Sequence, residues 1–498
     1  MSVNHEDQKL KKTFGSNLMP LYFALVLTIG IGLGKYWDFS GLSKPFASQS
    51  KLEQVMELVS DQYVDTLNQT ELEDKAINKY LHSFDPHSTY IAARDVAAAN
   101  QDLKGSFDGV GIEFFLHNDT PYVARVIENG PAMKAGVLPS DRILSADDTS
   151  LLGKNNKEII SFLKGKRQST VRVQIWRNAT GELLSKDIQR GKVKLKTVQT
   201  SLLDDSTVYF KVAHFANPTL DQFNEGLKKY QKDNSLSRII IDLRGNPGGY
   251  LQVAVELLDE FIDSQELLAY TLGKGENRKT YNATLGGSCK DLELICLVNR
   301  YSASASEIFS GAIQDLDRGI VIGERTYGKG LVQETFHLQD ASQVRLTVSR
   351  YYIPSKRSIQ KPYGENGYTG DTSISPQKFR TKNGRKVAAG GGVEPDVMLE
   401  EPITADQKDY INQHIRFVDA NFNLIIGLKT VSDFWKSESI LDKINLIPNF
   451  TEDDKQALKA ELAYQFYGDD AWIFEPSRNA YLQEAMNYFD KKAVLLNP

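Results

Sequence analysis

Buried-strand patterns alternate with helical patterns between residues 192 and 350, and this alternation constrains the fold more than any other feature of the sequence. The runs 239–241, 292–298 and 319–323 each predict a strand, and helical spacing of apolar residues follows the first two. Alternating strands and helices predict an α/β core, in which helices cover a sheet. The chain of 498 residues is long enough for two or three domains, each with its own core.

Ser304 and Lys329 follow the second and third of these strands. Ser304 begins a helical pattern, and Lys329 stands between two glycines on a turn. Serine is a poor nucleophile until a base removes its proton. A lysine amine is such a base only when neutral, so its pKa of about 10.4 must fall by roughly 3 units, about 4 kcal/mol. Tyr327, Leu331 and Val332 give Lys329 an apolar setting that favours this shift, so the pair predicts a Ser/Lys hydrolase.

A Ser-His arrangement is the alternative, because the fold can bring His87, His117 or His214 to Ser304. The sequence Asp85-Pro86-His87 is interpreted as an ordinary turn. No metal-ligand spacing or phosphate loop is apparent, so neither a metal nor another cofactor is expected. The net charge of −5 gives no indication of nucleic acid as a partner. With two cysteines the chain is no disulfide-dense scaffold, and Cys296 is expected to pack within its strand.

The N-terminus carries an export pattern. Residues 18–34 are uncharged and apolar, and three lysines precede them between positions 9 and 12. Cations before an apolar segment are typical of a secretory signal or a signal anchor. We expect a cytoplasmic segment at 1–17 and a transmembrane anchor at 18–36, favoured over a cleaved signal peptide. In either case the catalytic body is extracytoplasmic, on the periplasmic or extracellular face.

A helical region at 49–103 precedes a separate unit with strand periodicity at 104–190. The unit opens with a glycine-rich segment at 109–114, continues to a helix near 157–163 and then reaches an alternating strand at 171–177. This order of landmarks resembles a PDZ domain. The resemblance implies that backbone N–H groups of the opening capture a terminal carboxylate while the peptide adds as a strand. The implied peptide-binding positions are Gly109, Val110, Gly111 and Ile112.

Three further segments, 242–249, 299–315 and 326–333, together with the PDZ-like unit resemble the C-terminal processing peptidases, also called tail-specific proteases. The resemblance covers about residues 50–400. It implies a multidomain α+β and α/β protein, with a PDZ domain and a ClpP/crotonase-like peptidase core at 192–400.

The same resemblance implies roles for single residues. Ser304 matches the nucleophile and Lys329 the general base, and Gln333, one helical turn beyond, matches the group that orients the lysine. A developing oxyanion needs hydrogen-bond donors. The implied donors are the backbone N–H groups of Ala305 and of either Gly248 or Gly249. Among charged residues, Glu307 and Asp315 match polar positions near the site, and Asp242 and Arg244 are expected to brace the loop.

Residues 401–498 turn helical and carry no recognisable chemistry, so we expect an extension that packs, dimerises or gates. The sequence thus predicts an exported, membrane-anchored serine endopeptidase that cuts proteins near their C-termini. Its partners are polypeptides with accessible tails, with a homo-oligomer or an adaptor as further options. The PDZ unit is expected to hold the tail, and gating of the site by this unit is a hypothesis that the sequence leaves open. The alternatives are a catalytically silent PDZ scaffold and a hydrolase or isomerase for small acyl substrates.

Overall fold

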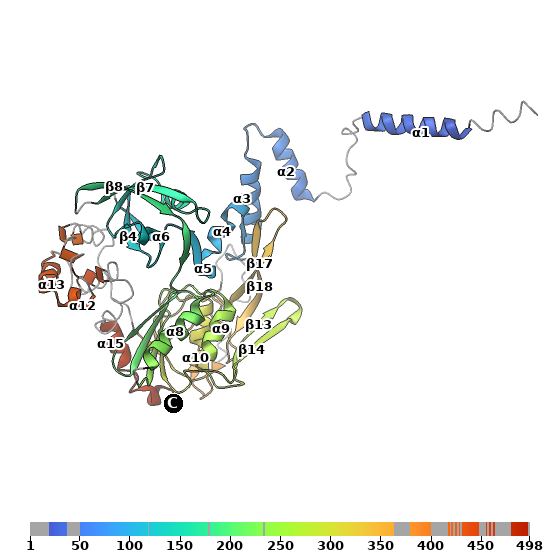
Figure 1. Ribbon diagram of the computed structural model, residues 1–498. Helices are drawn as coiled ribbons and strands as arrows, with labels where there is room; N and C mark the ends of the chain where they lie inside the picture. Colours follow the sequence, from blue (N-terminus) through green and yellow to red (C-terminus); the bar gives the residue numbers. More distant parts are fainter. Residues whose placement is uncertain are drawn as a thin grey trace, which may run out of the picture. The chain divides into compact units, whose positions relative to one another are not determined.

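The computed structural model describes most of the chain (Figure 1). The described residues are 19–36, 50–117, 119–177, 180–232, 235–362, 379–399, 431–447, 480–496 and single positions between 417 and 463. The chain divides into two compact units, Met1–Lys75 and Ala76–Pro498. The expected cytoplasmic segment 1–17 and part of the extension 401–498 lie outside the described residues.

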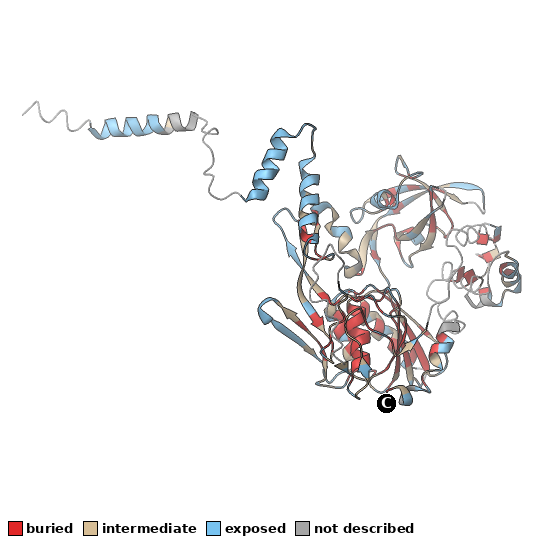
Figure 2. Cartoon of the chain, turned by 180° about the vertical axis from the view of Figure 1, so that it is seen from behind, coloured by how far each residue is buried: buried red, intermediate tan, exposed pale blue. Residues whose placement is uncertain are grey.

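The first unit contains helices α1 (Met19–Tyr36) and α2 (Lys51–Gln62). α1 covers the segment predicted as an anchor. Of the helices described, none is both long and apolar enough to cross a membrane. Ser50 caps α2, because its hydroxyl accepts the N–H of Glu53 at 3.2 Å while its own N–H donates to the Glu53 carboxylate at 2.6 Å. The side chains of α2 are all exposed, as the pale blue of Figure 2 shows.

A five-strand path forms the sheet of the unit at 104–190, in the order β3-β4-β5-β7-β8 with β6 beside β5. Val171, Val173 and Ile175 of β7 are buried while the residues between them are exposed, which is the two-residue period of a half-buried strand. The elements are β2 (Ser106–Gly109), β3 (Ile112–His117), β4 (Thr120–Val126), α6 (Pro131–Lys134), β5 (Arg142–Ala146), β6 (Thr149–Ser150), α7 (Asn156–Leu163), β7 (Thr170–Arg177), β8 (Glu182–Gln189) and β9 (Gly191–Lys194).

The α/β core contains a six-stranded sheet in the order β10-β11-β12-β15-β16-β21, parallel except for the pair β10–β11. Helices α8, α9 and α10 cover one face; α10 is buried along its whole length, and α8 and α9 bury the side that faces the sheet, as the red in Figure 2 shows. The strands are β10 (Val198–Leu202), β11 (Thr207–Val212), β12 (Arg238–Asp242), β15 (Glu293–Val298), β16 (Ile320–Gly323) and β21 (Val397–Met398). The helices are α8 (Thr219–Gln231), α9 (Leu251–Asp259) and α10 (Ala305–Asp315).

A second sheet joins distant parts of the sequence. β18 pairs with β1, β13 and β17, and β13 also pairs with β14. Its strands are β1 (Thr89–Ile91), β13 (Leu267–Gly273), β14 (Arg278–Asn282), β17 (Leu331–His337) and β18 (Gln343–Tyr352). The smaller elements are α3 (Gln69–His82), η2 (Ala93–Asp95), α4 (Val96–Ala99), α5 (Gln101–Lys104), η3 (Lys274–Glu276), β19 (Phe379–Arg380) and β20 (Lys386–Val387).

Helices α15 (Ala480–Met486) and α16 (Lys492–Leu496), with the turn between them, cover the other face of the six-stranded sheet. Leu482, Phe489 and Leu496 pack against sheet residues such as Ile240 and Ile322. Part of the expected extension therefore packs on the core. The described helices of this region are α12 (Val431–Lys436), α13 (Glu438–Asn445), α15 (Ala480–Met486) and α16 (Lys492–Leu496).

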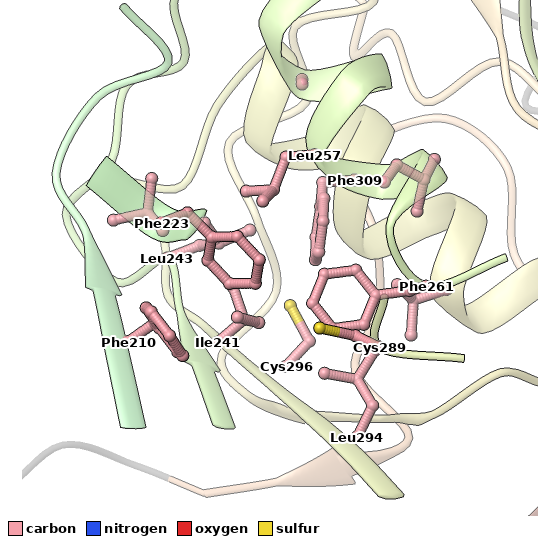
Figure 3. Packing of buried hydrophobic residues seen from close by; sticks show 14 of the residues in the cluster. Phe210, Phe223, Ile241, Leu243, Leu257, Phe261, Cys289, Leu294, Cys296 and Phe309 are labelled. Atoms are coloured by element: carbon pink, nitrogen blue, oxygen red, sulfur yellow. The ribbon is translucent and has the colours of Figure 1, made fainter. Parts of the chain in front are cut away.

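Between the sheet and helices α8–α10 lies an aromatic core (Figure 3). The rings of Phe261 and Phe309 meet edge to face, 5.8 Å apart. Cys289 and Cys296 are both free thiols inside this cluster. The expectation of a packed Cys296 is confirmed, and burial raises the pKa of Cys289 to about 12, so neither thiol is poised to react.

Candidate active site

Ser304 stands at the N-cap of α10 with φ 56° and ψ −113°. A non-glycine residue rarely adopts a positive φ, and such strain clusters at functional sites. The chain reaches this turn directly from β15, as the sequence predicts. The neighbouring serines are unavailable, because Ser302 and Ser306 are fully buried and donate to the carbonyl oxygens of Leu243 and Asn246. Ser304 is therefore the reactive serine that the geometry favours.

Lys329 lies in the turn between β16 and β17 with a largely buried side chain. Burial lowers the pKa of Lys329; Asp85 acts to raise it, Arg345 to lower it and Glu307 to raise it. The net direction is downward, toward the neutral amine that a general base requires. No hydrogen bond joins the Ser304 and Lys329 side chains among the described contacts, and catalytic contacts often tighten only when substrate binds.

Glu307 joins the two segments that carry Ser304 and Lys329. One carboxylate oxygen accepts the N–H of Ser304 and the N–H of Lys329, both at 2.8 Å. The other accepts the N–H of Gly328 at 2.7 Å and the hydroxyl of Thr326 at 2.5 Å. Burial raises the pKa of Glu307 to about 7 against the effect of these four hydrogen bonds. Glu307 thus fixes the backbone of both residues, and it lies near the site as expected.

Tyr351 holds the same two residues by their carbonyl groups. Its hydroxyl lies 3.0 Å from the carbonyl oxygen of Ser304 and also hydrogen-bonds that of Lys329. The ring is 1% exposed, and burial raises the pKa of the phenol well above its usual value. Tyr351 therefore remains a protonated donor. No local pattern in the sequence indicates this role for Tyr351, because only the pairing of β18 with β17 brings it to the site.

A cavity of about 800 Å³ collects the predicted catalytic residues. Its lining includes Ser304, Ala305, Gly248, Gly249, Lys329 and Gln333. Leu251, Ile308 and Leu331 give it an apolar wall, and His214 also lines it. Residues from segments about 80 positions apart thus share one solvent-accessible space, as the Ser/Lys prediction requires.

Gln333 lies on strand β17, so the expectation that it stands one helical turn beyond Lys329 is wrong. The glycines around Lys329 lead into a strand, whose pairing with β18 places Gln333 opposite Thr347. Its Nε2 donates to the Thr347 hydroxyl at 3.2 Å. Gln333 still faces the cavity with Lys329.

The glycine loop approaches Ser304 from the end of β12. A Cβ at Gly248 would lie 2.9 Å from the Ser304 Cβ and 3.0 Å from the Ala305 nitrogen, so only glycine fits there. The Gly248 N–H donates to Asn246 Oδ1 at 2.8 Å. Among the hydrogen bonds of the described residues, the N–H groups of Ala305 and Gly249 have no protein acceptor. The pair that remains open for an oxyanion is therefore Ala305 and Gly249.

Asp242 and Arg244 brace this loop, as expected. Asp242 is fully buried and accepts the Tyr209 hydroxyl at 2.7 Å and the Arg244 guanidinium at 2.7 Å. Burial works to raise the pKa of Asp242, but Arg244, Lys211 and the Tyr209 hydroxyl together hold it far below its usual range. Neither residue lines the cavity.

Asp315 does not belong to the site, which corrects the expectation from the sequence. It stands at the last turn of α10, roughly 16 Å along the helix from Ser304. Its carboxylate pairs with Arg357 at 2.9 Å, with both side chains fully buried. Its role is to hold the α10 end in place.

Of the three alternative histidines, His87 is the one whose pKa is shifted by the charge of Lys329. Burial, followed by the charge of Lys329, lowers the pKa of His87 to about 4. His214 lines the cavity, and His117 ends β3. No described hydrogen bond links any of the three to Ser304. The Asp85-Pro86-His87 segment is a turn, as predicted, and it lies beside the site.

The opening of the unit at 104–190 is held in place through its carbonyl groups. The carbonyl oxygens of Val110 and Gly111 accept the N–H groups of Ala132 and Ile127 at 2.8 and 3.0 Å. Among the described hydrogen bonds, the N–H groups of Val110 and Gly111 donate to no protein acceptor. Gly109 ends β2 and Ile112 begins β3.

Comparison with known proteins gives matches over the unit at 104–190 and over the α/β core. The profile of peptidase family S41 matches residues 206–374, and that of the PDZ domain matches residues 109–188. A probable CtpA-like serine protease of Staphylococcus saprophyticus is 31% identical over 370 residues, 74% of this chain and 73% of that protein. A carboxy-terminal-processing protease of Bartonella bacilliformis is 31% identical over 359 residues, 72% of this chain and 76% of its own. Among solved structures, the photosystem II D1 C-terminal processing protease is 26% identical with a TM-score of 0.39, covering 71% of this chain and 87% of that one.

Proposed function

The chain belongs to peptidase family S41 and is a serine protease of the carboxy-terminal processing type, and on this premise we propose that it cuts polypeptides near their C-termini through a Ser304–Lys329 acyl-enzyme mechanism. The observation that carries the proposal is the shared clamp on these two residues, since Glu307 and Tyr351 bind the backbone of both. The intact serine and lysine segments argue against a silent PDZ scaffold, and the PDZ unit argues against a small acyl substrate.

The neutral amine of Lys329 is the general base in this mechanism. It takes the Ser304 proton as Oγ attacks the scissile carbonyl, and it returns that proton to the departing amine. A water then attacks the acyl-enzyme ester, with Lys329 again taking the proton, which frees Ser304. The apolar wall of the cavity supports a lowered pKa, because burial disfavours the ammonium form.

The oxyanion of the tetrahedral intermediate is assigned to the backbone N–H groups of Ala305 and Gly249. Ala305 is the first residue of α10, so its N–H lies at the positive end of the helix dipole. Gly249 is exposed in the cavity, whereas the N–H of Gly248 already serves Asn246. Two fixed donors of this kind stabilise charge that develops only during the reaction.

The PDZ unit is proposed to hold the substrate tail. Its free N–H groups at Val110 and Gly111 suit a terminal carboxylate, and a tail in extended form would pair with β3. The substrate class is therefore a polypeptide with an accessible, unstructured C-terminus. Whether the unit also gates the cavity is tested by comparing turnover with and without an added tail peptide.

Export is proposed from the N-terminal sequence. Three lysines before position 13 precede the apolar run, and α1 spans 18 residues, about 27 Å at 1.5 Å per residue. The cations and the apolar run carry the proposal rather than the length of α1: we propose that the segment serves as an export signal or anchor and that the body lies outside the cytoplasm. Protease treatment of whole cells, combined with N-terminal sequencing of the mature chain, separates anchor from cleaved signal.

A homo-oligomer or an adaptor is proposed from the exposed apolar side chains of α2. Leu52 is 58% exposed and Val55 is 55% exposed, on a helix with no buried residue. Light scattering of the full chain, compared with a Leu52→Glu variant, tests this. A lower mass for the variant supports self-association, and an unchanged monomer excludes it.

The catalytic proposal is tested by degradation of a protein that carries an apolar C-terminal tail. Ser304→Ala and Lys329→Ala are expected to lose activity by at least about 10³-fold. Lys228→Ala, an exposed lysine on α8, is the matched control and keeps full activity. Full activity in either catalytic variant rejects the assignment.

A further inference from the structure

A turn at residues 85–88 lies beside the strands that carry Gln333 and its partner. The turn leads into β1, which pairs with β18, and β18 pairs with β17. Thr89 of β1 lies opposite Arg345, and Gln333 of β17 lies opposite Thr347, two residues further along β18. The turn therefore reaches β18 at the level of Gln333.

The carboxylate of Asp85 is buried and fully engaged. One oxygen accepts the N–H groups of His87 and Ser88, both at 2.7 Å, and the other accepts the Ser88 hydroxyl at 2.6 Å. The Ser88 hydroxyl in turn accepts the N–H of Thr347 at 3.1 Å. The Thr347 hydroxyl interacts with the Asp85 carboxylate as well, and this interaction lowers the pKa of Asp85. Burial acts to raise the pKa of Asp85, but these hydrogen bonds outweigh it and lower the pKa, so the carboxylate is charged at neutral pH.

The single proton of the Thr347 hydroxyl sets the direction of the next hydrogen bond. A charged Asp85 can only accept, so the Thr347 hydroxyl, which lowers the pKa of Asp85, directs its proton toward that carboxylate. The Thr347 oxygen is then left as an acceptor, and it accepts the Nε2–H of Gln333 at 3.2 Å. With Nε2 held in this way, Oε1 is the atom that the Gln333 amide can offer to Lys329, which lines the same cavity.

We propose that Asp85 is a positioning residue for the general base: through Thr347 it fixes which end of the Gln333 amide faces Lys329. A neutral amine has two N–H groups and one lone pair. An amide oxygen accepts one N–H and leaves the lone pair free for the proton of Ser304. A reversed amide presents an N–H to that lone pair and blocks the base. This inference rests on the Ser304–Lys329 mechanism proposed above.

The charges around Lys329 give the inference a second readout. Asp85 and Glu307 act to raise the pKa of Lys329, and Arg345 acts to lower it. His87 contributes no charge at neutral pH, because burial and then Lys329 lower its pKa to about 4. Removing the charge of Asp85 therefore lowers the pKa of Lys329 further, whereas removing the Thr347 hydroxyl leaves these charges in place.

The test measures kcat, KM and the pH profile of cleavage of a tailed substrate for Asp85→Asn, Thr347→Val, Thr347→Ser and the double variant Asp85→Asn/Thr347→Val. Valine matches threonine in shape without its hydroxyl, and serine keeps the hydroxyl. The amide nitrogen of asparagine is a donor where the Asp85 carboxylate is an acceptor. Asp85→Asn can therefore make Thr347 accept from position 85 and donate to Gln333, which reverses both hydrogen bonds. Thermal unfolding of each variant confirms that it is folded, and Lys329→Ala serves as the reference for the mechanism itself.

We expect Asp85→Asn and Thr347→Val each to lower kcat by about 10-fold or more with little change in KM, because the base is misaligned. Thr347→Ser keeps most of the activity, and the double variant loses no more than the worse single one. The acid limb of the profile moves to lower pH in Asp85→Asn and in the double variant, and it stays in place in the two single Thr347 variants. Equal kcat for Thr347→Val and Thr347→Ser, or an unmoved acid limb in Asp85→Asn, overturns the inference. An active Lys329→Ala instead rejects the proposed mechanism.

Discussion

Glu307 and Tyr351 hold the same two residues by opposite backbone groups: Glu307 accepts the N–H groups of Ser304 and Lys329, and the hydroxyl of Tyr351 reaches their carbonyl oxygens. Both side chains are buried, so neither contact is loosened by solvent. The proposed nucleophile and base come from different turns, and side-chain flexibility alone would let them move apart. These contacts from Glu307 and Tyr351 fix the backbones of Ser304 and Lys329 relative to each other, and they leave the Ser304 hydroxyl and the Lys329 amine unused.

Glu307→Gln should break this clamp while keeping its shape. Four donors point at the carboxylate, and the amide nitrogen of glutamine replaces one acceptor with a donor. A backbone N–H left facing a donor costs about 1–3 kcal/mol. We expect a lower melting temperature and a loss of kcat of at least about 10-fold. Glu225→Gln, on the exposed side of α8, is the control, and equal behaviour of the two variants would refute the role of Glu307.

Gly248→Ala tests the approach of the glycine loop to the site. The added Cβ would lie 2.8 Å from the Ala303 carbonyl oxygen and 3.0 Å from the Ala305 nitrogen, at a φ of +104°. The variant should lose about 100-fold or more in kcat, as when an oxyanion donor is displaced. Gly245→Ala is the matched control, because its φ is +74° with nothing within 4 Å, so it bears only backbone strain of about 1–2 kcal/mol. A similar kcat in both variants contradicts the prediction.

Lys329→Met should make the protein inactive and more stable. Methionine fills a similar volume without an amine that must lose its hydration. Because burial lowers the pKa of Lys329 from the usual 10.5, the unfolded chain binds more protons than the folded one between the two values. Wild-type stability therefore rises with pH in that window. The gain in melting temperature of the variant should be largest at low pH and shrink as the pH rises, and a gain that grows with pH rejects a lowered pKa.

Phe489→Ala tests whether the C-terminal helices are part of the core fold. Phe489 is 3% exposed on the six-stranded sheet, and the Arg238 guanidinium lies 5.2 Å from its ring centre. Truncating such a ring costs about 3–5 kcal/mol. Val494→Ala, at a side chain that is 80% exposed, should change stability by less than about 0.5 kcal/mol. Urea denaturation measures both, and equal midpoints show that these helices do not stabilise the core.

Features that depend on local sequence were predictable. The strand before Ser304, the helix after it and the glycine turn of Lys329 all follow from residues within a short window. The same holds for the capture loop, where Gly111 is followed directly by β3. In each case the residues of a few neighbouring positions determine the local backbone conformation.

Features that depend on pairing between distant segments were not predictable. Gln333 was expected on a helix, because its spacing from Lys329 fits one helical turn, but pairing with β18 makes it part of a strand. Asp85 looked like part of an ordinary turn, and its role arises only because β1 joins β18. The contacts that surround Lys329 and Gln333 therefore depend on strand pairing in the sheet around β18, and no local sequence pattern predicts them.

The most direct test of the Ser304–Lys329 mechanism is covalent labelling of the purified protein with a fluorophosphonate probe, with the adduct located by peptide mass spectrometry. We expect a single adduct on Ser304, with a labelling rate that rises with pH as Lys329 loses its proton and that falls by at least about 100-fold in Lys329→Ala. An adduct on another serine, or an equal labelling rate in Lys329→Ala, would contradict the assignment of Ser304 as nucleophile and Lys329 as its base.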